Sequence, residues 1–353
     1  MLCTIAPSSR AARLSLLLDS GLGTVEEVHH VRRPSQQLLD GGPVARISLP
    51  VEELLESPRA RRHALSASEP EGDIGSWSPE DGSYVAACVA VKDRSDDLRE
   101  WIDYHRALGV GHFYVFETDT AEASDWALED LIQEGVVDYY YLPHVTPTTV
   151  PMMQIRIYRL CLQHTRHRHA WMAFVDVDEF LVPTNATQGL KGVLEEYADV
   201  PGLVVNWRLM GSGGHEGRPA EGTLAAYQSC TPVSFHDNLH VKSIVNTRLV
   251  ANTSTDPHHF EYLGGATAFT TARDPVDGPA APAVHYEKLA LFHYALKSRE
   301  EYELKMLRGS AMGNYKGMDF FDRVDAAATE QCPQAFEACR RFGLDWCAGK
   351  AGA

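Results

Sequence analysis

The alternation of apolar runs with helical patterns between Tyr84 and Trp207 constrains the fold more than any other feature of the sequence. The run from Tyr84 to Val91 is continuously apolar, which is typical of a strand buried on both faces of a parallel sheet. Asp96 and Asp97 then favour a helix start, because acidic side chains interact well with a helix N-terminus. The next apolar positions recur at helical spacing and are Leu98, Trp101, Ile102, His105 and Leu108. This segment therefore predicts one strand followed by one helix.

The same alternation continues along the chain. Further strands are expected at Phe113 to Phe116, Val136 to Leu142, Trp171 to Val175 and Leu203 to Trp207. Helices are expected between them at Leu128 to Ile132, Gln154 to His164 and Leu190 to Tyr197. Strands that alternate with helices predict an α/β fold with a doubly wound, mostly parallel, Rossmann-like sheet. Ligands of such sheets bind outside the carboxyl ends of the strands.

Composition sets the class of protein and its organisation. The 353 residues carry 32 Lys and Arg against 48 Asp and Glu, a formal charge of −16, which argues against a nucleic-acid partner. Hydrophobic residues make up 44%, as in globular proteins. Residues 1–80 show no sustained period, and we expect a poorly ordered arm with a short helix near Val51 to Leu55. Residues 81–350 are expected to form a single catalytic domain.

The seven cysteines include no CxxC pair, so the spacing of a zinc ribbon is absent. Cys88 and Cys161 lie in apolar stretches and are interpreted as small core residues. Cys332, Cys339 and Cys347 crowd the C-terminus, and one disulfide among them is expected in an oxidising compartment. No run reaches the roughly 18 apolar residues of a membrane helix. The chain as given is therefore interpreted as soluble, or as a sequence without its anchor.

Asp176 and Asp178 follow the strand expected at Trp171 to Val175. In extended backbone, residues i and i+2 project to the same side, so the two carboxylates converge and repel unless a cation joins them. Mn²⁺ or Mg²⁺ prefers such oxygen ligands and keeps positions open for substrate phosphate. The alternative interpretation is a solvated acidic turn. Glu179 comes next, either as a capping carboxylate or as a catalytic one.

Five ordered blocks resemble glycosyltransferase family 92, once labelled a domain of unknown function. They are "CVAVKDRSDDLREWIDYHRALGVGHFYVFE" (Cys88 to Glu117), "FVDVDEFLVP" (Phe174 to Pro183), "VVNWRLMGSGGH" (Val204 to His215), "HVKSIV" (His240 to Val245) and "LFHYALKSREEYELKMLRG" (Leu291 to Gly309). The resemblance covers residues 84–310. It implies a GT-A-fold, inverting, galactosyltransferase-like enzyme that uses a nucleotide sugar and a divalent metal.

The resemblance and the strand ends together suggest roles for individual residues. Asp178 resembles the metal-ligating acid of the family's Asp-x-Asp motif, and Asp176 shares the metal or holds the donor ribose. The third ligand is expected to be His293, with His259 second. Candidate nucleotide contacts at strand ends are Lys92, Asp93, Glu117, Thr118 and Asp119. Candidate diphosphate contacts are Lys242, Lys305 and Arg308. For Lys305 and Arg308, which are one helical turn apart, the alternative is a solvated basic face of a helix.

The catalytic base is expected to be Glu216 or Asp237, with Asp256 as a further rival. Three glycines, Gly211, Gly213 and Gly214, would allow the backbone to approach a sugar closely. Two aromatic side chains, Trp207 and Phe260, are candidates for stacking on a sugar ring. Two departures from the family pattern leave an altered or inactive enzyme open. They are Asp93-Arg94, where the family tends to have Asn-Glu, and Ala225-Ala226, where it often has an acidic-basic pair.

The leading interpretation is a metal-dependent transfer of a sugar, galactose first, from a UDP-sugar to a glycan or glycoprotein hydroxyl. The alternatives are a metal-dependent nucleotidyl or phosphoryl transferase, and a degenerate family member that binds sugars without turnover. No GxxxxGK[ST] phosphate loop is present. The resemblance further implies a Golgi enzyme facing the lumen and held by an N-terminal membrane helix, which this sequence does not show.

Overall fold

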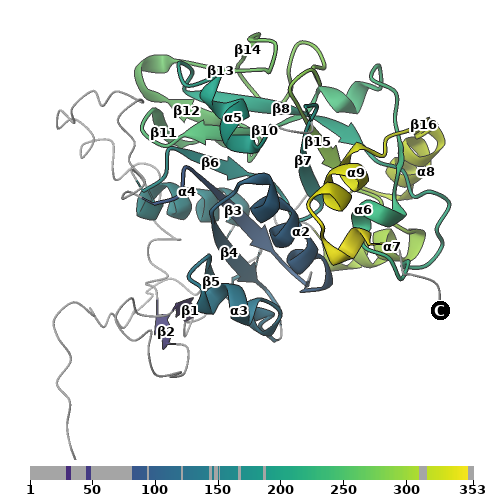
Figure 1. Cartoon of the computed structure of the whole chain (residues 1–353), viewed down its shortest axis with the longest axis horizontal. Coiled ribbons are helices and arrows are strands. Elements are labelled where there is room, and N and C mark those ends of the chain that lie inside the picture. The colour runs from purple at the N-terminus through teal and green to yellow at the C-terminus, as the bar shows by residue number, and fades with distance from the viewer. Residues whose placement is uncertain are drawn as a thin grey trace, which may run out of the picture.

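The computed structural model describes residues 29–32, 45–48, 82–93, 95–120, 122–142, 145–146, 150, 152–165, 168–185, 188–309 and 316–348. Figure 1 shows one large twisted sheet with helices packed against it. Twelve strands form this sheet, and its main path runs β14-β13-β8-β10-β6-β3-β4-β5-β1-β2. Strand β15 joins the sheet through β8, and β7 joins it through β15.

The core of the sheet is parallel, as the alternation predicts. Its strands are β3 (Val85–Val91), β4 (His112–Thr118), β5 (Val137–Leu142) and β6 (Trp171–Phe174), and β3 pairs in parallel with both β4 and β6. The connecting helices are α2 (Ser95–Leu108), the short 3₁₀ turn η3 (Asp125–Leu128) with α3 (Glu129–Gln133), and α4 (Met153–Thr165). The helix expected after the first strand is confirmed, because all five of its periodic residues are buried.

Both faces of the sheet are covered, which explains the continuously apolar strands. Along β3, Ala87 and Val89 pack into one hydrophobic cluster, and Ala86 and Cys88 pack into a second cluster. The first cluster contains residues of α2 and α3, and the second contains residues of α4. The doubly wound α/β class expected from the sequence is confirmed.

The second half of the chain adds antiparallel pairing to this core. Strand β10 (Val241–Asn246) lies antiparallel to both β6 and β8 (Gly202–Leu209), and β15 (Leu289–His293) lies parallel to β8 and antiparallel to β7 (Glu179–Pro183). The smaller strands are β9 (Ser229–Cys230), β11 (Val250–Thr253), β12 (Phe260–Tyr262), β13 (Ala268–Phe269), β14 (Pro275–Val276) and β16 (Glu330–Gln331).

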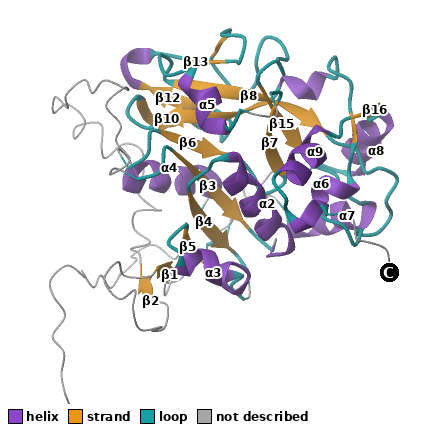
Figure 2. Ribbon diagram, in the orientation of Figure 1, coloured by secondary structure: helices purple, strands orange, loops and turns teal. Residues whose placement is uncertain are grey.

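The later helical elements are α5 (Leu190–Glu195), α6 (Thr223–Ala226), η4 (His236–Leu239), η5 (Leu263–Gly265), α7 (Arg299–Arg308), α8 (Met318–Ala327), α9 (Gln334–Arg341) and η6 (Asp345–Cys347). Of these, α6, α7, α8 and α9 lie beside β7 and β15, as Figure 2 shows. Helix α7 begins with a capping box, in which Ser298 and Glu301 satisfy each other's backbone N–H groups. Within the described residues, no helix combines the length and apolar character that crossing a bilayer requires.

Two strands lie within the expected N-terminal arm. Strand β1 (His29–Arg32) pairs antiparallel with β5, and β2 (Ala45–Ser48) pairs antiparallel with β1. The short helix expected near Val51 to Leu55 lies outside the described residues.

Three disulfides join cysteines within the described residues, and they correct part of the cysteine interpretation. Cys88 and Cys161 are buried as expected, but they are bonded to each other rather than being separate core residues. Cys339 bonds Cys347, which provides the one C-terminal disulfide expected there, whereas the partner of Cys332 is Cys230. The correction has a physical cause: β3 and α4 are distant in sequence, so only the packed fold brings their cysteines to a Cα separation of 6.4 Å.

The Cys88–Cys161 disulfide fastens α4 to the central strand and predicts a measurable loss on removal. Its cysteines are 73 positions apart, so replacing both by alanine is expected to lower the free energy of unfolding by about 3–4 kcal/mol in a urea titration. The matched control replaces Cys339 and Cys347, which are 8 positions apart and close a much smaller loop, so its loss is expected to be about 2 kcal/mol less. Equal losses in the two variants would contradict the loop-closure account.

Candidate active site

The carboxyl ends of the parallel strands meet where the strand order reverses. Strand β3 lies between β4 and β6, so the connection through α2 leads to one side of β3, and β6 is added on the other. This reversal is the position at which open α/β sheets bind ligands. Lys92 directly follows β3, and Asp176 and Asp178 follow β6. The structure therefore brings these predicted site residues to one edge of the sheet.

Asp176 accepts hydrogen bonds from three side chains of two different elements. Lys242 of β10 donates from Nζ to Oδ2 at 2.8 Å, and Gln154 and Tyr158 of α4 donate to Oδ1 at 2.7 and 3.3 Å. The Lys242 side chain is 1% exposed. Burial acts to lower the pKa of Lys242, but the nearby carboxylates of Asp176 and Glu179 outweigh it, and the pKa lies well above its usual value. Lys242 is therefore a buried, positively charged partner of Asp176 in the acidic turn.

Asp178 lies between a lysine and a histidine. Lys305 of α7 donates from Nζ to Oδ2 at 2.7 Å, and it also donates to the carbonyl of Ala295 at 3.1 Å. On the other side, Oδ1 is 3.8 Å from Nε2 of His293. The backbone carbonyl of Asp178 accepts the N–H of Tyr294 at 2.8 Å, which fixes the acidic turn to the end of β15. Lys305 belongs to α7, whose first turn is stabilised by the Ser298–Glu301 capping box.

His293 is neutral at physiological pH. Burial lowers its pKa to about 3, although the carboxylate of Asp178 acts in the opposite direction. Its ring packs edge-on against Trp207, with 4.4 Å between ring centroids, and His240 stacks on the same indole at 4.9 Å. Lys316 lies over the Trp207 ring with Nζ 5.4 Å from the centroid. The site thus has one wall of aromatic rings.

The cationic groups at strand and helix ends come from distant parts of the chain. Lys92 forms an ion pair with Asp119 at the end of β4, and its Nζ is 3.4 Å from the carbonyl of Arg308 at the end of α7. Asp93 lies beside Lys92 with a left-handed φ of 48°. The nucleotide and diphosphate candidates other than Glu117 are therefore arranged around the switch point.

Glu117 differs from the other candidates because its contacts are internal. Its side chain is fully buried in β4, and it accepts the N–H and hydroxyl of Ser124 at 2.8 Å each and the hydroxyl of Tyr139. These contacts hold the loop that follows β4. A role in binding a ligand directly would require Glu117 to release these partners.

The candidates for a catalytic base lie in different settings. Asp237 in η4 is paired with Arg323 at 2.8 Å. Burial acts to raise the pKa of Asp237, but the guanidinium of Arg323 outweighs it, and the pKa is lowered overall. Asp256 caps the loop backbone by accepting the N–H of His258 at 2.8 Å. His259, the second choice for a metal ligand, has Nδ1 3.4 Å from the hydroxyl of Ser254.

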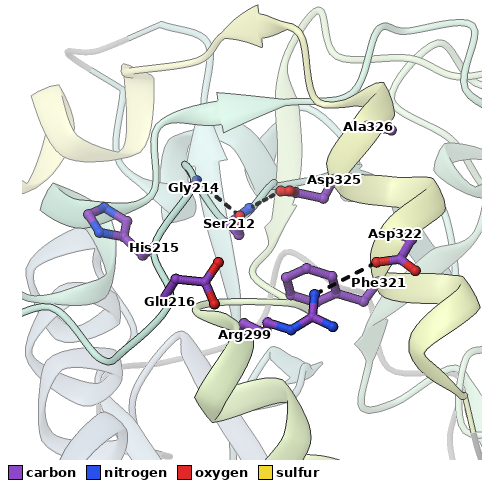
Figure 3. Close-up of a pocket in the computed structure, with 9 residues that line it drawn as sticks. All are labelled: Ser212, Gly214, His215, Glu216, Arg299, Phe321, Asp322, Asp325 and Ala326. Carbon is purple, nitrogen blue, oxygen red and sulfur yellow. Dashed lines mark hydrogen bonds and ion pairs between the residues drawn. The ribbon is translucent and has the colours of Figure 1, made fainter.

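Glu216 is exposed and lines a cavity of about 250 Å³ at the N-terminal end of α7 (Figure 3). Arg299 points across this cavity toward Asp322, 4.0 Å away, and Ser212 donates its N–H to Asp325 at 2.7 Å. Gly213, in the turn before Glu216, has φ of 62°, which favours glycine at this position. The cavity and the acidic turn are thus at opposite ends of α7.

Sequence reasoning did not single out Gln154, Tyr158 or Lys316. Gln154 and Tyr158 are one helical turn apart on α4, a spacing that places both on one face. That spacing was visible in the sequence, but nothing local shows that the face meets Asp176. Lys316 follows a segment without periodicity, and no sequence signal indicates its position over Trp207.

An open α/β sheet with an Asp-x-Asp turn and cationic side chains at its switch point belongs to the class of α/β domains that bind their ligands at this edge. Comparison with known families is more specific: the family described as Glycosyltransferase family 92 matches residues 83–289. The chain belongs to this family, and the family resemblance is confirmed. The matched residues contain the first four sequence blocks, whereas the fifth, Leu291 to Gly309, lies beyond them.

Family 92 proteins of plants are similar to the chain over part of their length. A protein of Ricinus communis is 25% identical over 210 residues, which is 58% of this chain and 36% of that protein. One of Arabidopsis thaliana is 26% identical over 192 residues, or 51% of this chain and 32% of that protein. The chain thus spans about a third of the length of these curated relatives.

Among solved structures, similar chains include two synthases of phosphoglycerate glycosides. Glucosyl-3-phosphoglycerate synthase from Mycobacterium tuberculosis, solved with Mn²⁺ and uridine diphosphate, has a TM-score of 0.25 and 11% identity over 40% of this chain and 51% of its own. Mannosyl-3-phosphoglycerate synthase from Rubrobacter xylanophilus has a TM-score of 0.26 and 17% identity over 42% of this chain and 48% of its own. At these scores the likenesses carry no argument about the site.

The buried position of Lys242 predicts a large effect on stability when its charge is removed. In Lys242→Met the carboxylates of Asp176 and Glu179 lose a buried counter-charge, and the free energy of unfolding is expected to fall by about 3–5 kcal/mol in a urea titration. The control is Lys288→Met, whose exposed pair with Glu196 is screened by solvent and is expected to leave the unfolding midpoint unchanged. Equal midpoints for the two variants would contradict the account.

Proposed function

We propose that this chain transfers a sugar from a nucleoside diphosphate sugar to a hydroxyl of a glycan or glycoprotein, with inversion at the anomeric carbon. The donor to test is a UDP-sugar, beginning with UDP-galactose. Membership of family 92 supports the reaction class. The observation that carries the proposal is the pairing of acidic and basic side chains at the strand ends, where Lys242 pairs with Asp176, Lys305 with Asp178 and Lys92 with Asp119. In such a site the carboxylates can offset the positive charge of a cation, and the lysines can offset the negative charge of the diphosphate that accompanies it.

The side chains at the acidic turn fit a hard divalent cation such as Mn²⁺ or Mg²⁺. Oδ1 of Asp178 and Nε2 of His293 are 3.8 Å apart, which is too long for a hydrogen bond but within the span of two ligand bonds of about 2.1 Å each. The neutral imidazole of His293 retains a lone pair for such a bond. Within the described part of the chain, no group of three or more His, Cys, Asp or Glu side chains is arranged to hold a metal ion. Asp178 and His293 would hold such an ion, and its remaining positions would be open to the donor.

The chain's own residues have distinct tasks in this reaction. A bound divalent cation would supply Lewis-acid compensation for the charge that grows on the leaving diphosphate. Lys305 donates a hydrogen bond to Asp178, and it is placed to exchange this carboxylate for a phosphate oxygen when the donor enters. Asp176, held by Lys242, is placed to accept a ribose hydroxyl or to share the cation. Glu216 or Asp237 would take the proton of the attacking acceptor hydroxyl.

We propose that the chain works in an oxidising compartment, and the Golgi lumen is the compartment we favour. The three disulfides support this location, because such bonds persist in oxidising environments and are rare in the cytosol. The acceptor is then a glycan or glycoprotein that passes through the same compartment.

Titration calorimetry of UDP into the purified chain, with and without Mn²⁺, tests the donor site. Wild type is expected to bind UDP more tightly when Mn²⁺ is present. In Asp178→Asn this gain is expected to fall by at least tenfold, because changes even outside the ligand shell cost about 10–100-fold. The control Asp199→Asn alters an exposed carboxylate paired with Arg273 and is expected to retain the gain.

The products released from donors separate the candidate functions. Release of UDP from a UDP-sugar supports sugar transfer, and release of pyrophosphate from a nucleotide supports nucleotidyl transfer. If folded wild-type protein binds no UDP at any accessible concentration, the UDP-sugar proposal is wrong.

A further inference from the structure

Glu179, the first residue of β7, is a fully buried carboxylate that the proposed reaction does not use. Its Oε2 accepts the backbone N–H of Asp176 at 2.8 Å and is 3.8 Å from Nζ of Lys242. The first contact fixes the geometry of the Asp-Val-Asp turn. The second oxygen, Oε1, is buried and has no hydrogen-bond partner in the described part of the structure. A buried acceptor without a partner costs about 1–3 kcal/mol, so a second role for this carboxylate is worth seeking.

The nearest candidate partner lies directly across the sheet. Glu179 and His293 are paired residues in the antiparallel register of β7 and β15. Nδ1 of His293 is 3.8 Å from Oε1 of Glu179, and it too is buried without a partner among the described residues. Residues directly opposite each other on antiparallel strands have Cβ atoms about 4.5–5.5 Å apart, so their side chains are within reach of each other. A shift of less than 1 Å would satisfy both atoms with one hydrogen bond.

The opposite ring nitrogen faces the acidic turn. Nε2 of His293 is 3.8 Å from Oδ1 of Asp178. In neutral imidazole one nitrogen carries the proton and the other carries the lone pair, and the hydrogen bond made by one nitrogen determines the role of the other. A carboxylate that accepts the Nδ1 proton therefore leaves the Nε2 lone pair directed toward Asp178.

We propose that Glu179 is a positioning residue that holds the Asp-Val-Asp turn through the N–H of Asp176 and fixes His293 as the Nδ1–H tautomer, with its Nε2 lone pair directed at the cation position beside Asp178. The consequence for cation affinity rests on the proposed function, whereas the tautomer does not. A carboxylate behind a ligating histidine also makes the imidazole a better donor and orients its ring.

Glu179→Gln tests this arrangement with little change in shape. The single amide oxygen of glutamine is expected to keep the N–H of Asp176, so its NH₂ group faces Nδ1 of His293. Nδ1 must then accept a hydrogen bond from this NH₂ group rather than donate one, so the tautomer is reversed to Nε2–H. Affinity for Mn²⁺ with UDP present, measured by electron paramagnetic resonance, is expected to fall about 10–100-fold. UDP binding without metal is expected to be unchanged.

The matched control is Glu100→Gln. Glu100 is also a buried carboxylate that caps backbone, since it accepts the N–H groups of Thr223 and Leu224 at 2.8 and 3.1 Å, but it does not contact His293. This control is expected to leave both Mn²⁺ affinity and the His293 tautomer unchanged. A loss of Mn²⁺ affinity equal to that of Glu179→Gln would show a general effect on stability and overturn the proposal.

The tautomer gives a readout that is independent of metal binding and of activity. Nitrogen-15 NMR of histidine-labelled wild-type protein is expected to show Nδ1–H at His293, with the signal assigned by its loss in His293→Gln. An Nε2–H tautomer in the metal-free wild type would overturn the proposal, even if Glu179→Gln fails to fold. Wild type that shows Nδ1–H but binds no Mn²⁺ with UDP would instead contradict the proposed function.

Discussion

The pairing of lysines with the Asp-Val-Asp turn is the interaction on which the site depends. Asp176 and Asp178 follow β6 in a turn, closed by the N–H of Glu179 donating to the carbonyl of Asp176 at 3.0 Å, and not in the extended backbone expected from the sequence. Each of the two carboxylates is compensated by a lysine of its own. Lys242 is buried, whereas the Lys305 side chain is about one-third exposed, so Lys305 is the lysine of the two that a ligand from solvent can reach.

The antiparallel half of the sheet can be understood from this requirement. Strand β10 pairs with β6 and brings Lys242 beside Asp176, while β15 pairs with β7 and brings His293 opposite Glu179. Helix α7 then follows β15 and carries Lys305 to Asp178. The parallel half provides the switch point and the acidic turn, and the antiparallel half provides the charges and rings that make this edge a site. Neither half contains the complete arrangement.

The sequence predicts those parts that depend on local patterns. Apolar runs and helical spacing locate β3, α2 and β6, and the position of Asp176 and Asp178 after a buried strand indicates the site edge. The pairing of Cys88 with Cys161, and of Gln154 with Asp176, depends on how α4 packs across the sheet, for which no local pattern exists. Glu117 shows that a local pattern can also mislead. A polar residue at a strand end suggests a ligand contact, yet Glu117 bonds to Ser124 and Tyr139 inside the protein.

A crystal structure of the chain with UDP and Mn²⁺, with anomalous diffraction to locate the ion, tests the central claim most directly. The account predicts an anomalous peak between Oδ1 of Asp178 and Nε2 of His293, with the diphosphate beside Lys305. An ion and nucleotide bound elsewhere, for example in the cavity lined by Glu216 and Arg299, would contradict the assignment of the donor site to the switch point of the sheet.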